Sequence, residues 1–306
     1  MSVHKDTIGD KVFNTINYTL LLLLGISTIY PFIYFLVLSF NDGFDALKGG
    51  VYLWPRLFTL DNYRKAFEHP LILNSFKITF LRTIIGTVLS VLFTAMLAYG
   101  ISKKNLPGRK GLIFFFFFTT LFNAGLVPRF VLYRQMHLYN NFWVYVIPGI
   151  YSFYNAIVMK TFFDGIPDSL SEAAEIDGCS EMGIFFKIIL PLSGPVLATI
   201  ALFVGVGHWN DWFTGSFFTS KDELMPAATL LNKLLTEASF ESSTGAAGAG
   251  GNTLNINNAL QQAKSAVTPE SLRMTFLIII TTPIICVYPF LQKYFVKGVM
   301  VGSIKE

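Results

Sequence analysis

Six long apolar stretches separated by polar segments dominate this sequence of 306 residues. A helix needs about 20 apolar residues to cross a hydrocarbon core of roughly 30 Å, and its backbone polar groups must be paired without help from lipid. The pattern therefore predicts an all-α, polytopic membrane protein with six transmembrane helices. We expect the spans near residues 16–40, 71–102, 111–132, 136–160, 188–219 and 272–292.

The first apolar stretch, residues 16–40, is uncharged and longer than the apolar region of a signal peptide, and no small-residue cleavage signature follows it. We expect it to be retained as a span. The predicted organisation is a cytoplasmic N-terminus at 1–15, a transmembrane domain at 16–299 and a cytoplasmic tail at 300–306.

Composition agrees with a chain surrounded mostly by lipid. Hydrophobic residues make up 53% and charged residues 14% of the chain, and the mean hydropathy is +0.53. The net charge of +4 gives no indication of nucleic-acid binding. The two cysteines lie in different environments and the four histidines share no ligand spacing, so neither a disulfide framework nor a metal site is expected.

Basic residues indicate the orientation, because short cytoplasmic loops are enriched in Lys and Arg. The turn at 103–110 carries four cations and no acid, and Lys residues also occur before the first span and after the sixth. Both termini and this turn should therefore be cytoplasmic. The loop at 220–271 is then external, with helix-like pieces at 227–238 and 254–266 on either side of a Gly/Ala-rich stretch at 245–251.

The cytoplasmic segment at 163–187 contains a short, polar, helix-like motif. Ser169 and Glu172 have the spacing of a capping box, and Gly178 stands where a helix ends with positive φ. A helix of about nine residues is marginal by itself in water, so we expect it to dock against a partner.

This motif resembles the EAA loop of the permease subunits of type I ABC importers. The match runs through Glu172-Ala173-Ala174, Asp177-Gly178 and Leu190-Pro191. The form is similar to that of the carbohydrate class of the maltose transporter (MalG-like), and especially to second permeases of the LplC and alginate-importer type. Further likeness at 123–128, 209–213 and 292–298 extends it over nearly the whole chain. Cys179, where the family commonly has Ala, and the stretch at 245–251 depart from the family pattern.

The resemblance implies a type I ABC importer permease fold and a set of partners. These are a second homologous permease, two ATPase subunits and an external sugar-binding protein, assembled in the bacterial cytoplasmic membrane. Glu172, Ala173, Ala174, Asp177, Gly178, Leu190 and Pro191 would couple the permease to the ATPase. No phosphate-binding loop pattern occurs in the sequence, so ATP and Mg would be used by the partner, and this chain would be neither an enzyme nor the holder of a cofactor.

Asp211 is the acid in an otherwise uncharged apolar run, where a charge is costly unless it faces the protein interior or the membrane boundary. It could belong to a boundary anchor with Trp209 and Trp212, or it could line a sugar pathway with Trp209 and Asn210. Lys77 and Arg82 are expected at the boundary. The other candidate pathway residues are Asn123, Tyr151, Tyr154 and Asn155.

Two rival functions are open at this stage. An ion-driven secondary transporter or a membrane-embedded enzyme should carry acid pairs or catalytic groups well inside several spans. Apart from Asp211 and the boundary residues Lys77 and Arg82, these spans lack them. An ABC permease for a solute other than a sugar is the second alternative.

The predicted orientation can be tested by labelling single cysteines with a membrane-impermeant reagent in intact cells. We expect strong labelling at position 247 and none at position 108, because the first lies in the external loop and the second in the cytoplasmic turn. The reverse pattern would overturn the orientation.

Overall fold

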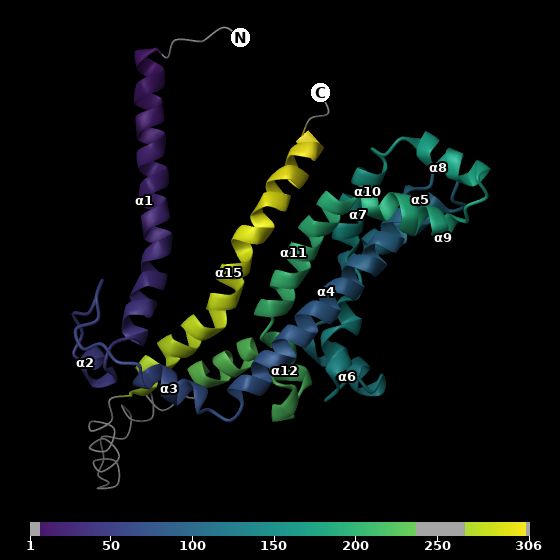
Figure 1. Ribbon diagram of the computed structural model, residues 1–306. Helices are drawn as coiled ribbons and strands as arrows, with labels where there is room; N and C mark the ends of the chain where they lie inside the picture. Colours follow the sequence, from purple (N-terminus) through teal and green to yellow (C-terminus); the bar gives the residue numbers. More distant parts are fainter. Residues whose placement is uncertain (1–6, 237–266, 304–306) are drawn as a thin grey trace. The chain divides into compact units, whose positions relative to one another are not determined.

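The computed structural model describes residues 7–236 and 267–303, and the side chains of the last helix through Val287 and at Pro289. These parts are built from helices, with an isolated antiparallel bridge between Asn41 and Phe58. The chain divides into two compact units. Unit 1 comprises Met1–His69 and Glu237–Ile279, and unit 2 comprises Pro70–Thr236 and Ile280–Glu306 (Figure 1).

In unit 1, a buried asparagine connects the end of the first helix with the start of the last one. The helices are α1 (Ile8–Ser39), α2 (Gly43–Leu47), α3 (Asp61–Phe67) and the beginning of α15 (Pro269–Ser303). The Asn62 amide donates to the carbonyls of Ser39 at 3.0 Å and Asn41 at 2.8 Å, and its Oδ1 accepts from Ser271 Oγ at 2.8 Å. These bonds satisfy carbonyls that the end of α1 leaves free.

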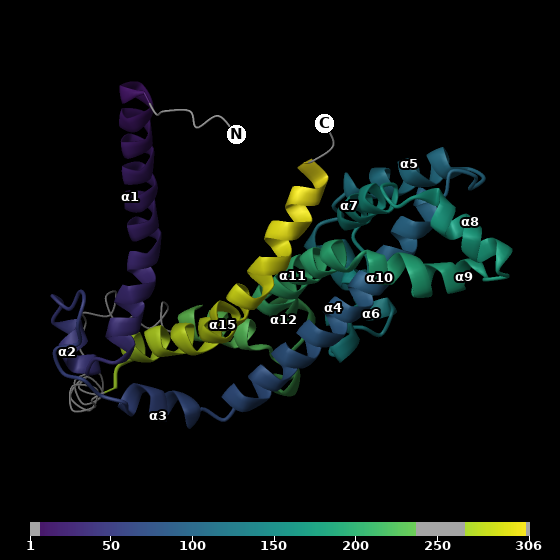
Figure 2. The ribbon, with the colours of Figure 1, turned by 45° about the horizontal axis from the view of Figure 1, so that its top comes forward.

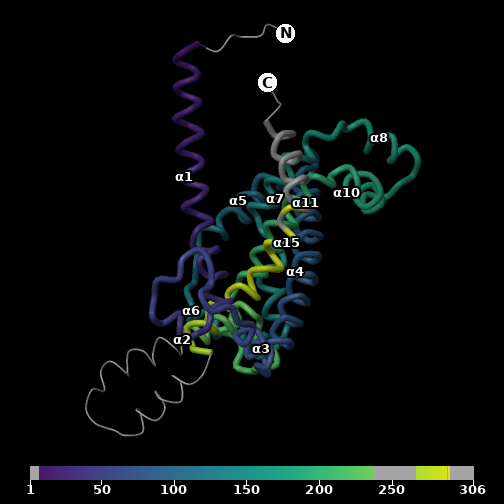
Figure 3. Tube along the Cα trace, turned by 60° about the vertical axis from the view of Figure 1, so that its left-hand side comes forward, coloured from purple at the N-terminus to yellow at the C-terminus, as the bar shows by residue number. Residues whose placement is uncertain are grey.

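Unit 2 is organised around one long helix, α4 (Ile72–Ser102), which packs along α7 (Phe153–Phe163) and α11 (Gly194–Asn210) (Figure 3). Residues 227–236 are also helical. The other elements are α5 (Arg109–Thr120), α6 (Leu126–Gln135), η1 (Phe142–Tyr145), η2 (Ile147–Gly149), α8 (Asp168–Ile176), α9 (Glu181–Ile184), the π-helical η3 (Phe185–Ile189), α10 (Leu190–Leu192), α12 (Phe213–Phe218) and η4 (Asp222–Leu224).

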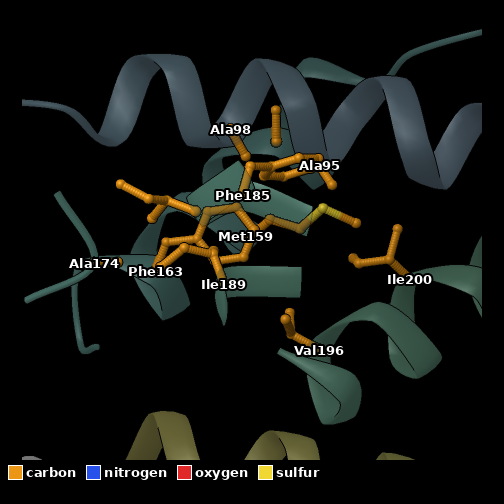
Figure 4. Close-up of a cluster of buried hydrophobic side chains, with 11 residues drawn as sticks. Ala95, Ala98, Met159, Phe163, Ala174, Phe185, Ile189, Val196 and Ile200 are labelled. Atoms are coloured by element: carbon orange, nitrogen blue, oxygen red, sulfur yellow. The ribbon is translucent and has the colours of Figure 1, made fainter. Parts of the chain in front are cut away.

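A buried apolar cluster joins α4, α7 and α11 to the segment that carries α8 (Figure 4). Ala95 and Ala98 on α4 have no exposed surface, which allows the larger side chains of the neighbouring helices to pack closely. The cluster comprises Ala95, Ala98, Ala156, Met159, Phe163, Ala174, Ile184, Phe185, Ile189, Val196 and Ile200.

The structure confirms the all-helical class and the long second apolar helix, whose bounds nearly match the predicted 71–102. By length and composition, Ile8–Ser39, Ile72–Ser102 and Pro269–Val287 could each cross a membrane. Two bent pairs, covering 142–163 and 181–210, raise this number to five among the described residues. The count of six spans and the position of the termini stay predictions.

Several helix bounds differ from the predicted spans, and the bounds of the spans stay predictions. Helix α1 begins at Ile8 and α15 runs from Pro269 to Ser303, so both exceed the predicted spans and the predicted tail begins inside α15. The spans expected at 111–132, 136–160 and 188–219 are interrupted. Apolar composition does not show these breaks, because they depend on partners elsewhere in the fold. The Gly/Ala-rich stretch at 245–251 and the piece at 254–266 lie outside the described residues.

Gly215 provides a test of the packing around α12. A Cβ at this position would lie within 3 Å of Pro226 and would overlap Thr229, whereas a Cβ at Gly100 on α4 would meet nothing within 4 Å. We expect Gly215→Ala to destabilise the chain by about 1–3 kcal/mol through overpacking. Gly100→Ala should be neutral or slightly stabilising, because Ala favours a helix by up to about 1 kcal/mol over Gly.

The measurement is the thermal midpoint of each variant in detergent, followed by size-exclusion chromatography of the heated sample. Equal midpoints for Gly215→Ala and Gly100→Ala would contradict the close packing of α12.

Candidate functional site

One face of α4 carries buried polar side chains at helical spacing, which we call the α4 polar stripe: Ser75, Thr79, Arg82, Ser90 and Thr94. Residues three and four apart share a face of a helix, so the stripe points toward the neighbouring elements. Thr79 Oγ1 accepts from the Ala227 amide at 2.8 Å, and Thr94 Oγ1 accepts from the Ser152 amide at 3.2 Å. The stripe thus supplies partners to backbone groups outside continuous helices.

Arg82 stabilises the break between α11 and α12. Its Nη2 donates to the carbonyl oxygen of Asp211, and its Nη1 lies 3.5 Å from Asp211 Oδ2. The guanidinium carbon is 5.1 Å from the centroid of the Tyr145 ring. Asp211 Oδ1 in turn accepts from the Thr214 amide at 3.0 Å in the first turn of α12. One ion pair therefore satisfies groups on both sides of the break.

The boundary position of Arg82 stays a prediction, and the structure shows where this residue lies in the fold. It is located inside α4 with a side chain that is 0% exposed, while the Asp211 side chain is 30% exposed. A buried guanidinium is very unfavourable without a counter-charge, and Asp211 provides it. A single charge in an apolar run indicates that a partner must exist, but only the fold shows which residue it is.

A cavity of about 550 Å³ lies beside this ion pair in unit 2. Asp211 contributes its acid, and a second arginine, Arg129, comes from α6. The full lining is Arg129, Tyr133, Val144, Tyr145, Pro148, Gly149, Val204, Gly207, His208, Asp211 and Thr214. The volume falls within the range of roughly 300–1,000 Å³ that is usual for small-molecule sites.

Of the predicted pathway residues, Asp211 lines this cavity and Asn123 is connected to it. Asn123 Oδ1 accepts from Arg129 Nη2 at 3.0 Å. Trp209 instead faces a separate apolar cavity of about 430 Å³, bordered by α4, α11 and α15 within unit 2. Its Nε1 donates to the Ile280 carbonyl at 3.2 Å, and its ring packs edge-to-face on Phe80.

The four other predicted pathway residues lie away from the lining of the charged cavity. Tyr151 packs against Phe116 of α5 with ring centroids 5.8 Å apart, and Tyr154 is 73% exposed. Asn155 is buried in the first turn of α7, and Asn210 is exposed at the end of α11. Their role in a pathway stays a prediction.

Sequence reasoning did not select five polar lining residues: Arg129, Tyr133, Tyr145, His208 and Thr214. Arg129 and Tyr133 are four residues apart on α6, and this spacing places them on one face. Tyr145 and His208 come from η1 and α11, so only the fold brings them together.

The EAA-like motif forms helix α8, but its N-terminal cap differs from the prediction. The helix begins at Asp168 after Pro167, and no side chain caps it, so the predicted capping box of Ser169 and Glu172 is wrong. The helix starts two residues earlier than this box requires, which places Ser169 inside the first turn. Gly178 has φ +80°, which confirms the predicted positive-φ turn.

Two ion pairs connect the α8 segment to the end of α4. Figure 2 shows α8 and α9 near each other at the right of the view. Lys104 Nζ is 2.8 Å from Asp168 Oδ2, and Lys103 Nζ is 2.9 Å from Glu181 Oε2. The Tyr99 hydroxyl also donates to Glu181 at 2.6 Å. The hydrogen bond from Lys104 lowers the pKa of Asp168, so this carboxylate stays charged at neutral pH and the contact is lost only as the pH falls through that lowered value.

Helix α8 has one buried residue, Ala174, which packs into the apolar cluster of unit 2. Glu172, Ala173 and Asp177 are exposed, and Ile176 is 87% exposed. Leu190 and Pro191 lie in α10, directly after the π-helical turn η3. Some motif residues therefore lie on α8, whose outer face is exposed, and Leu190 and Pro191 lie on α10, which leads into α11.

Comparison with known proteins identifies the family of this chain. Residues 90–301 match the family model described as the binding-protein-dependent transport system inner membrane component. The chain belongs to this family. Family membership makes it a multi-pass component of an ABC transporter of the inner membrane, and it sets aside the secondary transporter and the membrane-embedded enzyme.

Relatives over the full length agree with this family. The polygalacturonan/rhamnogalacturonan transport system permease protein YtcP of Bacillus subtilis (strain 168) is 34% identical and covers 97% of this chain and 99% of its own length. Protein LplC of the same organism is also 34% identical, with 98% and 97% covered. A chain in the crystal structure of a bacterial ABC transporter involved in the import of the acidic polysaccharide alginate has a TM-score of 0.84 at 28% identity, with 96% of this chain and 100% of that chain covered.

The Arg82–Asp211 pair in this family member can be tested with a double-mutant cycle. Asp211→Asn should destabilise the chain by about 3–5 kcal/mol, because it leaves a buried guanidinium without a counter-charge. Arg82→Met should cost less, because Asp211 is partly exposed to the cavity. The double variant Arg82→Met/Asp211→Asn should be more stable than Asp211→Asn alone.

Thermal unfolding of the four proteins in detergent measures the coupling between the two positions. Strictly additive losses would show that the ion pair does not stabilise the break.

Proposed function

We propose that this chain is one of two permease subunits that form the translocation pathway of an ATP-driven oligosaccharide importer in the bacterial cytoplasmic membrane. The names of the full-length relatives support the sugar class, since they include permeases for polygalacturonan and rhamnogalacturonan, arabinooligosaccharides, galactooligosaccharides and maltodextrin. An external binding protein delivers the oligosaccharide, and a second homologous permease completes the pathway.

The observation that carries the coupling part of the proposal is the uncovered helix α8. It is polar, is held to the rest of unit 2 by Ala174 and the Lys104–Asp168 pair, and exposes Glu172 and Ile176. A short helix with an uncovered face gains stability from a docked partner. One of two ATPase subunits is that partner in this proposal, and the ATPase subunits bind the ATP and Mg.

Helix α4 connects the proposed docking site with the charged cavity. Its last residues lie beside Lys103 and Lys104, which contact the α8 segment, and Arg82 on the same helix holds Asp211. These positions are roughly 33 Å apart along a helix with a rise of 1.5 Å per residue. A displacement of α8 is therefore passed by a continuous rigid element to the break between α11 and α12.

Coupling can be tested with Glu172→Lys and Gly178→Val in the complete importer. The charge reversal alters the uncovered face, and Val at φ +80° strains the turn after α8 by about 1–2 kcal/mol. We expect both variants to insert in the membrane while substrate-stimulated ATP hydrolysis, sugar uptake and co-purification of the ATPase fall several-fold.

Matched controls are Glu223→Lys, a charge reversal at an exposed residue of η4, and Gly183→Ala, at a glycine without positive φ. Both should behave as the unmodified chain. Full coupling in Glu172→Lys and Gly178→Val would overturn the assignment of α8. Uptake of an amino acid or a metal ion, with no response to any oligosaccharide, would favour the alternative of a non-sugar permease.

A further inference from the structure

The cavity beside Asp211 contains a guanidinium that no acid neutralises within the part of the chain that the structure describes. Arg129 lines the cavity from α6, and its one recorded bond is to the neutral amide oxygen of Asn123 at 3.0 Å. Asp211, the acid of the lining, is already paired with Arg82, which is fully buried behind it. The site therefore has two guanidinium groups, those of Arg82 and Arg129, for the one carboxylate of Asp211, and the excess positive charge lies on Arg129.

The position of each charge determines which ligand the cavity favours. Without Arg82, the Asp211 carboxylate would repel any anion near it; the ion pair cancels most of this repulsion. Arg129 is only partly exposed, and an arginine keeps its charge at any physiological pH. Its planar fork of N–H donors matches the two oxygens of a carboxylate.

The rest of the lining is suited to a sugar ring. Tyr133 and Tyr145 contribute aromatic side chains to the lining, and His208 and Thr214 contribute groups that can form hydrogen bonds with hydroxyls. The volume of about 550 Å³ accommodates a small organic unit and not only an ion.

We propose that this cavity is a subsite for a uronate unit, a sugar ring that carries a carboxylate, and that Arg129 is the residue that selects the acid. The inference rests on the proposed function, since it names the class of oligosaccharide that passes through the pathway. Two relatives described above agree with it, one a permease for polygalacturonan and rhamnogalacturonan and the other from a transporter involved in the import of the acidic polysaccharide alginate.

The test compares a charged ligand with its neutral form. The probes are trigalacturonate and its fully methyl-esterified form, which differ in the carboxylates. The variants are Arg129→Gln, Arg129→Lys and the control Arg134→Gln, which removes a charge from an exposed residue of the same helix that does not line the cavity. Binding is measured on the purified complex of both permeases and the ATPase without the binding protein, so that selection by the binding protein does not contribute.

We expect the unmodified complex and Arg134→Gln to bind trigalacturonate about tenfold or more tightly than the ester, as charge-assisted hydrogen bonds imply. Arg129→Gln should abolish this preference, because it weakens the binding of the acid and leaves the binding of the ester unchanged. Arg129→Lys should retain part of the preference. In cells with the complete importer, Arg129→Gln should raise the KM for trigalacturonate uptake by a similar factor.

Equal binding of acid and ester by the unmodified complex, or an unchanged preference in Arg129→Gln, overturns the inference. If the Arg129→Gln complex does not assemble, Arg129→Lys provides the test. An equal change in affinity for the acid and for the ester in Arg129→Lys contradicts a role of Arg129 in selection. Uptake of a neutral oligosaccharide such as maltotriose, with trigalacturonate refused, overturns the uronate subsite and leaves the proposed function standing. An importer that no oligosaccharide stimulates contradicts both.

Discussion

A backbone group left free by a break in a membrane helix must find its partner inside the protein, because lipid offers none. In unit 2 that partner is a side chain of α4. Arg82 binds the carbonyl of Asp211 where α11 ends, and Thr94 binds the amide of Ser152 where α7 begins. Thr79 does the same for Ala227. The interrupted elements of unit 2 thus depend on the polar stripe of one uninterrupted helix.

In the proposed function, this dependence places binding and coupling on the same element. The middle of α4 fixes the ion pair beside the charged cavity, and the end of α4 approaches the segment that contains α8. Small residues on α4, such as Ala95 and Ala98, bring α7 and α11 close enough for these contacts. A rigid helix with one polar contact in its middle and another at its end can connect two distant sites, because a movement at either site acts on the helix.

The sequence was sufficient to predict the elements whose signal is local. The apolar run of α4 and the positive φ of Gly178 follow from composition and from a single residue type, and both are present. The breaks near Ser152 and Asp211 were not predicted, because their partners lie far away in the sequence. The pairing of Arg82 with Asp211 was not predicted for the same reason. Of the charged cavity, only Asp211 and, through Arg129, Asn123 were foreseen, since the lining comes from separate elements.

The α4 polar stripe also affects how natural variation in such proteins should be interpreted. Replacing Thr94 by Val keeps the shape of the side chain and makes the segment more apolar, so a hydropathy profile scores the change as favourable for a membrane helix. The hydroxyl that accepts from the Ser152 amide would nevertheless be gone, and a buried N–H without a partner costs several kcal/mol in a lipid environment. On this face of the helix, a substitution that increases hydrophobicity destabilises the protein. The stability of variants should therefore be ranked by the hydrogen bonds to the backbone that they preserve.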